Sequence, residues 1–224
     1  MINKFNLQNH DRNYFINNYK NYLNYEKKLN DNILALITPH AGLSYCVELL
    51  QFAYGQVSWK KYNKIVLLST HHQPGNFIPE SNIFNLSTKK FKLKDFFNLE
   101  NLTKKSDEKF LNEHSWLVQM PFIDNDAEIC LILVGTYDKN LVDKISNNID
   151  DKTLLLANTD LLHCGYDQYK IDCPTNIDKF NIDTINKITS LNINFKKNSM
   201  CGTAVIITLI EILKNKFNTK KIKY

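Results

Sequence analysis

Histidine, cysteine and aspartate side chains of this sequence gather in four short segments that could together bind a transition metal. The segments are 38–42, 69–72, 158–163 and 200–202, and they contain four of the six histidines together with Asp160 and Cys201. Mixed imidazole and thiolate ligands suit iron(II) or copper, and zinc also accepts them, whereas magnesium and calcium prefer oxygen ligands. The residue types therefore predict a mononuclear site, most simply one for a redox metal.

Three of these segments directly follow apolar runs at 33–37, 65–68 and 154–157. The runs are continuous rather than alternating, which is typical of parallel strands that are covered on both faces. In such sheets, ligands bind beyond the carboxyl ends of the strands. We therefore expect the three segments to meet at one edge of a sheet.

The histidines of the first two segments occupy equivalent places. His40 lies just past the first run, between Pro39 and a glycine that permits a close turn, so its ring is expected at the rim of the sheet. His71 and His72 lie past the second run, and adjacent residues of a strand point in opposite directions. Only one of these two histidines is therefore expected to reach the metal that His40 would bind.

Cys201 is expected in the first turn of an apolar helix, where the helix dipole and free backbone N–H groups lower the pKa of a thiol. It could then act as a thiolate ligand or, in a separate hypothesis, as a nucleophile with His163 or His40 as its base. The plainer alternative is a small apolar residue that begins a buried helix.

Asp160 and His163 are spaced as a carboxylate that orients an imidazole, and such a pair can do acid/base work. Asp160 could equally cap the turn that follows its strand. His114 lies in an expected helix, where a place in a pocket wall is the commoner role.

Strands and helices alternate along the chain, which predicts one α/β domain over 1–224 with a mostly parallel central sheet flanked by helices. Strands are expected at 33–38, 64–70, 129–134 and 153–158, with one or two shorter, antiparallel strands inserted at 83–93. Helices are expected at 11–29, 43–57, 106–120, 139–149, 176–192 and from 199, capped by Asn198 or Ser199, to 217. At the two ends of the sequence, we expect a helical leader at 1–32 and a basic tail at 218–224.

The composition argues against several classes of protein. The net charge of +5 comes from dispersed lysines, and the single arginine, Arg12, argues against a nucleic-acid partner. No apolar run approaches the roughly 18 residues of a membrane span, so a cytoplasmic protein is expected. Five irregularly spaced cysteines indicate reduced thiols rather than a disulfide framework.

The order of the motifs resembles the Memo family, including its AmmeMemoRadiSam system protein B type, over roughly residues 33–213. The resemblance is carried by PHAGLSY at 39–45, STHH at 69–72, EHS at 113–115 with QMPF at 119–122, DLLH at 160–163 and CG at 201–202.

The resemblance implies the fold of class III extradiol dioxygenases and their type of metal site. Carried onto this chain, it implies iron(II) or copper held by His40, His71 and Cys201. It also implies that Asp160 and His163 lie beside the metal as catalytic residues, with His72, His114 and Tyr45 around them.

The function expected from this resemblance is metal-dependent redox chemistry, dioxygenase-like, on an unknown substrate. The alternative is a non-catalytic module that binds a peptide or protein in the same cleft. Both hypotheses predict a small molecule or a peptide as the ligand, and neither predicts the oligomeric state.

Overall fold

The computed structural model describes residues 30, 33–86, 89–124, 126–165 and 171–217. The expected helix at 11–29 and the basic tail at 218–224 lie outside the described residues. Among the described helices, none combines the length and the apolar character needed to cross a bilayer.

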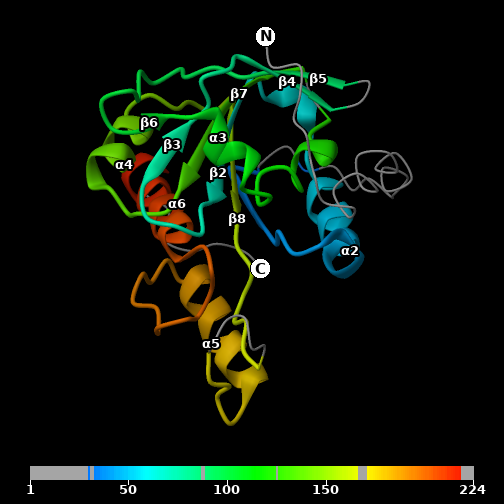
Figure 1. The fold of residues 1–224 in the computed structure, drawn as a ribbon, viewed down its shortest axis with the longest axis vertical. Helices are drawn as coiled ribbons and strands as arrows, with labels where there is room; N and C mark the ends of the chain where they lie inside the picture. The colour runs from blue at the N-terminus through cyan, green and yellow to red at the C-terminus, as the bar shows by residue number, and fades with distance from the viewer. Residues whose placement is uncertain (1–29, 31–32, 87–88, 125, 166–170, 218–224) are drawn as a thin grey trace.

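A six-stranded sheet forms the centre of the molecule, in the order β1-β8-β2-β7-β3-β6 (Figure 1). Its strands are β1 (Ala35–Thr38), β2 (Lys64–Thr70), β3 (Asn76–Ile78), β6 (Lys104–Lys105), β7 (Glu128–Val134) and β8 (Thr153–Asn158). All neighbouring pairs are parallel except β3 and β7, which are antiparallel. The predicted α/β class with a mostly parallel sheet is confirmed.

Parallel register brings the carboxyl ends of three strands to the same level. Thr38 of β1 pairs with Asn158 of β8, and β8 pairs along its other side with β2. The central strands β2, β7 and β8 contain almost only buried residues because both faces of the sheet are covered there, whereas β1 is half-buried. The segments after β1, β2 and β8 therefore emerge side by side.

Helices cover the sheet on both sides (Figure 1). Helix α2 (Leu43–Tyr54) packs on one face, in a core that also contains Trp59, Trp116 and the antiparallel hairpin of β4 (Ile83–Leu86) and β5 (Lys89–Lys92). Helices α4 (Lys139–Ser146) and α6 (Thr203–Phe217) build the core on the other face. The hairpin agrees with the antiparallel strands expected at 83–93.

The helix expected at 106–120 is much shorter. Helix α3 covers only Asp107–Leu111, and a 3₁₀ turn follows at Met120–Phe122. The carbonyl of Phe110, which a longer helix would bond to the N–H of residue 114, accepts from the N–H of Glu113 at 3.4 Å and from the indole of Trp116 at 2.9 Å. The indole thus occupies the end of the helix.

Helix α5 (Ile177–Thr189) begins after its cap Asn176, within the expected range, whereas α6 begins at Thr203 rather than at 199. Residues 200–202 form a turn that is tied to the segment after β8, because the N–H of Cys201 donates to the carbonyl of Asp160 at 3.1 Å. Cys201 thus precedes the helix and does not lie in its first turn.

The expectation that all cysteines are reduced is wrong for one pair, because Cys164 and Cys173 form a disulfide. The described residues on the two sides are close together: the N–H of Gly165 donates to the carbonyl of Ile171, and the two cysteine Cα atoms lie 5.1 Å apart. That separation suits a disulfide, and a spacing of nine residues gives no sequence signal for it. Cys46, Cys130 and Cys201 are free.

Candidate metal centre

His40 is held at the carboxyl end of β1 by its main chain and its ring. Its N–H and that of Ala41 donate to Oδ1 of Asp160, at 2.8 and 3.1 Å. Its Nδ1 lies 2.9 Å from Oδ1 of Asn158, and its Nε2 lies 3.3 Å from Sγ of Cys201. The ring is almost completely buried, so its outer nitrogen faces the cysteine rather than water.

Cys201 lies in the tight turn that connects to α6. A Cβ added at Gly202 would lie 2.3 Å from Oγ1 of Thr70, so only glycine lets this turn approach β2 so closely. Sγ of Cys201 accepts from the N–H of Asp160 at 3.3 Å. Burial by itself raises the pKa of this thiol, but hydrogen bonds with His40 and His72 outweigh burial and lower the pKa to about 6.

The structure brings His72, and not His71, to this pair. One atom each of His40, His72 and Cys201 lie within 4.8 Å of one another. The ring of His71 packs against Phe77, with centroids 5.0 Å apart, and its Nδ1 is bonded to the carbonyl of Gln73 at 2.7 Å. The expected ligand His71 therefore lies outside the cluster.

Strand alternation gives the physical reason. Residues 65 and 67 of β2 face the core that contains α2, whereas 66 and 68 face the core that contains α6. Continued past the strand end, this period of two places His71 on the side of Phe77 and His72 on the side of the turn that carries Cys201.

Glu113 supports His72 through a buried carboxylate. Its Oε2 accepts from Nδ1 of His72 at 2.8 Å and from the backbone N–H of the same residue at 3.2 Å. Hydrogen bonds with Cys201 and Glu113 raise the pKa of His72 to about 10. Burial raises the pKa of Glu113, but the hydrogen bond and charge of His72 outweigh burial and lower it to about 2.

His114 and Tyr45, both expected around the site, are placed differently. The ring of His114 stacks on that of His72, with centroids 5.7 Å apart, and meets His40 edge-on at 5.6 Å. It thus lies against both imidazoles of the cluster. Tyr45 lies on the outer surface of α2 and is 85% exposed, so it adds nothing to a buried wall.

Asp160 and His163 lie beside the cluster. Oδ2 of Asp160 is 3.5 Å from Nε2 of His163 and 3.8 Å from Nε2 of His40. Burial raises the pKa of Asp160, but the hydrogen bond with His163 and the charge and N–H of His40 outweigh burial and lower it to about 2. The hydrogen bond with Asp160 in turn raises the pKa of His163.

Asp160 bonds the backbone of a turn, but this is the turn after β1 and not the expected turn after its own strand, β8. One carboxylate oxygen accepts from the turn after β1, at the N–H groups of His40 and Ala41, while the other faces the imidazoles. The aspartate therefore shapes the backbone of the site and contributes charge to it.

The donor set fits a transition metal. Two ligands with bonds of about 2.1 and 2.3 Å in tetrahedral geometry lie about 3.5 Å apart, and His40 Nε2 and Cys201 Sγ are 3.3 Å apart. The low pKa of the thiol favours the thiolate that a metal requires. Nδ1 of each imidazole is occupied by Asn158 or Glu113, which leaves Nε2 to bind.

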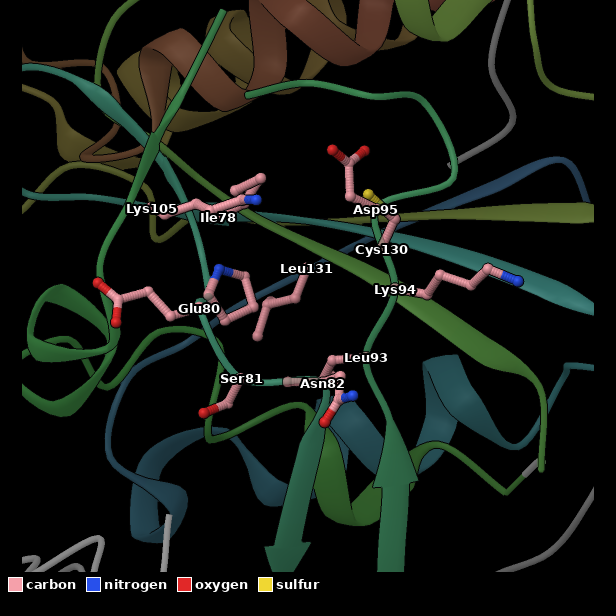
Figure 2. Close-up of a pocket in the computed structure, with 11 residues that line it drawn as sticks. Ile78, Glu80, Ser81, Asn82, Leu93, Lys94, Asp95, Lys105, Cys130 and Leu131 are labelled. Atoms are coloured by element: carbon pink, nitrogen blue, oxygen red, sulfur yellow. The ribbon is translucent and has the colours of Figure 1, made fainter. Parts of the chain in front are cut away.

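A cavity of about 230 Å³ lies elsewhere, between β3, β7 and the segment after β5 (Figure 2). Three of its charged side chains are already engaged: Lys94 pairs with Glu128, Lys105 with Glu100, and Asp95 accepts from backbone N–H groups. It shares no lining residue with the histidine cluster. This cavity therefore offers no comparable chemistry.

The sequence alone assigns no role to two residues of the site. Glu113 belongs to the motif at 113–115, and Asn158 ends an expected strand. Their roles depend on contacts across the fold, at separations of 41 positions for Glu113 and His72 and of 118 for Asn158 and His40. The sequence offers one indication of these roles: Glu113 is a polar residue next to His114, and Asn158 is a polar residue that directly follows the apolar run 154–157.

Comparisons with known proteins identify the family of this chain. The family model described as "Memo-like protein" matches residues 5–224. The chain is also similar to "MEMO1 family protein Ta0237" of Thermoplasma acidophilum, with 21% identity over 215 residues that cover 85% of this chain and 77% of the relative. Because the family model spans nearly the whole sequence, the chain belongs to the Memo family.

Proposed function

We propose that this protein binds iron or copper through His40, His72 and Cys201 and is a metal-dependent redox protein. The observation that carries the proposal is the approach of one ligand atom from each of these residues to within 4.8 Å. Zinc fits the same ligands but would not supply redox chemistry. A bound iron or copper ion supplies electron transfer and an open position for a small molecule.

Each residue of the chain has a separate task in this proposal. Cys201, which is half-buried, provides the negative charge of the ligand set. Glu113 orients His72 through Nδ1, so that its Nε2 faces the cluster. His114 stacks on His72 and restricts the motion of that ring.

Proton movement falls to His163 and Asp160. The side chain of His163 is 28% exposed, so it can exchange protons with water, whereas the carboxylate of Asp160 is nearly buried. Because Asp160 stabilises the protonated imidazole, His163 can take a proton from a ligand at the site and release it to solvent. Asp160 itself stays ionised over this cycle.

Metal analysis tests the assignment. Protein purified without chelator is expected to contain stoichiometric iron or copper by elemental analysis, and His40→Ala and Cys201→Ser are expected to lose it. Cys46→Ser is the matched control, because this buried thiol of α2 bonds the carbonyl of Ala41 rather than joining the cluster. Equal metal content in all four proteins would show that the assigned ligands are wrong.

Spectroscopy tests the thiolate ligand separately. Copper(II) added to the metal-free protein is expected to give a thiolate-to-copper charge-transfer absorption. The absorption should be lost in Cys201→Ser and kept in Cys46→Ser. Its persistence in Cys201→Ser would mean that another cysteine holds the metal.

A further inference from the structure

Four hydrogen bonds connect the carbonyl of Thr70 to the ring of His40. Oγ of Ser115 lies 2.5 Å from the carbonyl oxygen of Thr70, and Oγ of Ser69 lies 3.1 Å from Oγ of Ser115. Nδ2 of Asn158 lies 2.6 Å from Oγ of Ser69, and Oδ1 of Asn158 lies 2.9 Å from Nδ1 of His40. Ser69, Ser115 and Asn158 are completely buried, so water does not compete for these bonds.

The direction of every bond in this series follows from its first member. A carbonyl oxygen can only accept, so the hydroxyl of Ser115 donates to Thr70. The hydroxyl of Ser69 must then donate to Ser115, which leaves the oxygen of Ser69 as an acceptor. The amide nitrogen of Asn158 donates to that oxygen, so the amide oxygen faces His40.

Two further contacts support this orientation of the Asn158 carboxamide. Its Nδ2 also donates to the carbonyl of Ser115 at 3.3 Å, and its Oδ1 also accepts from the N–H of Thr70 at 3.1 Å. Exchanging the amide oxygen and nitrogen would set oxygen against the Ser115 carbonyl and an NH₂ group against the Thr70 N–H. The exchanged form loses these hydrogen bonds in a buried place, where each loss is costly.

We propose that Asn158 is the positioning residue that selects the tautomer of His40 with hydrogen on Nδ1, and so presents the lone pair of Nε2 to the metal. The inference rests on the proposed function for its purpose, although the tautomer itself is a property of the metal-free protein. A neutral imidazole carries one hydrogen, and an amide oxygen at Nδ1 requires that hydrogen there.

The two imidazoles of the cluster are thereby supported unequally. His72 is backed by the carboxylate of Glu113, whereas His40 is backed by a neutral amide. A carboxylate makes its imidazole a stronger donor than an amide does. Asn158 therefore orients His40 without adding another carboxylate to a site that already contains those of Asp160 and Glu113.

Nitrogen NMR of the metal-free protein tests the tautomer directly. At a pH where the ring is neutral, wild-type His40 is expected to show hydrogen on Nδ1, with its signals assigned by their loss in His40→Ala. Asn158→Leu removes the acceptor, so the hydrogen should move to Nε2, where Sγ of Cys201 can accept it. Asn158→Asp keeps an acceptor and should keep the Nδ1–H form.

Hydrogen on Nε2 in the wild-type protein would overturn the proposal, even if Asn158→Leu fails to fold. An unchanged tautomer in folded Asn158→Leu would overturn it too. A merely structural role for Asn158 predicts the same spectrum for the leucine and aspartate variants. Tautomer selection predicts that the two spectra differ.

Zinc affinity measured by competition with a chelating dye gives the second readout. Loss of a group that orients a ligand weakens binding about 10- to 100-fold, which is expected for Asn158→Leu and not for Asn158→Asp. Asn76→Leu is the matched control, because this buried asparagine accepts from Gly135 and Thr136 instead. Equal weakening in Asn76→Leu would contradict a specific role. If wild-type protein binds no zinc while the tautomer is as stated, the proposed metal site fails and the tautomer inference stands.

Discussion

A single carboxylate oxygen of Glu113 holds His72 twice, at 2.8 Å from the ring Nδ1 and at 3.2 Å from the backbone N–H. The other oxygen accepts from the N–H of Ser115 at 3.1 Å. One buried acid therefore fixes both the position and the ring orientation of the histidine that follows β2.

Glu113→Gln is expected to lower the pKa of His72 from about 10 towards its ordinary value of 6.5, because Cys201 and Glu113 together raise it. Protonated His72 should then lose its proton at lower pH in the metal-free protein, as followed by NMR of the ring. Glu128→Gln, which alters only a surface pair with Lys94, should leave the titration unchanged. An unshifted titration in Glu113→Gln would refute the coupling.

His71→Ala and His72→Ala form a matched pair of adjacent substitutions. His72→Ala is expected to weaken zinc or copper binding at least about 100-fold, since it removes a ligand, whereas His71→Ala should retain binding. His71→Ala should instead reduce stability by about 1–2 kcal/mol, because it removes the contact with Phe77 and the hydrogen bond to Gln73. Metal titration and urea unfolding measure the two effects. If His71→Ala weakened metal binding and His72→Ala did not, His71 would be the ligand instead.

Alkylation of the metal-free protein is expected to show Cys201 as its fastest free thiol. The pKa of Cys201 is about 6, so its thiolate persists at pH 7 and its rate should fall as the pH drops through 6. Burial raises the pKa of Cys46 to about 12 and that of Cys130 further, so both should react slowly. Mass spectrometry after iodoacetamide treatment follows each site.

Added zinc should protect Cys201 from this alkylation. Fast labelling that zinc does not slow would favour a nucleophilic cysteine over a metal ligand. Equal rates at Cys46, Cys130 and Cys201 would contradict the low pKa.

Gly202→Ala is expected to destabilise the protein by about 2 kcal/mol, because the new methyl group has no space beside Thr70. Gly42→Ala is the control: its added Cβ would meet only the ring of Tyr45 at an ordinary 3.5 Å. Thermal unfolding of the two variants should differ clearly. Similar melting temperatures would mean that the turn at Cys201 can move away from β2 at little cost.

Much of the architecture follows from local patterns. The continuous apolar runs before His40, His71 and Asp160 are buried parallel strands, and their common register explains why the polar segments converge. The antiparallel hairpin was also visible, because turn signals interrupt the alternation of strands and helices. These features depend on neighbouring residues and need no knowledge of distant contacts.

The structure differs from the sequence-based predictions where contacts between residues far apart in the sequence determine the local conformation. Trp116 takes the carbonyl that a longer α3 would use, and the turn at Cys201 bonds the segment after β8 instead of beginning α6. Strand alternation separates His71 from His72, but the run before them is apolar on both faces, so the sequence does not show which histidine faces the cluster. The family resemblance implies His71, whereas the cores that alternate residues of β2 face in the structure place His72 there.

Both tryptophans of the chain, Trp59 and Trp116, belong to the core on the α2 side of the sheet. Trp59 stacks on Tyr54 at 6.0 Å, and Trp116 meets Phe84 edge-on at 4.7 Å. Intrinsic fluorescence therefore reports on one half of the molecule, while loosening of α4 and α6 would leave the emission unchanged. A melting curve recorded by fluorescence and one recorded by circular dichroism would together show whether the two halves unfold as one unit.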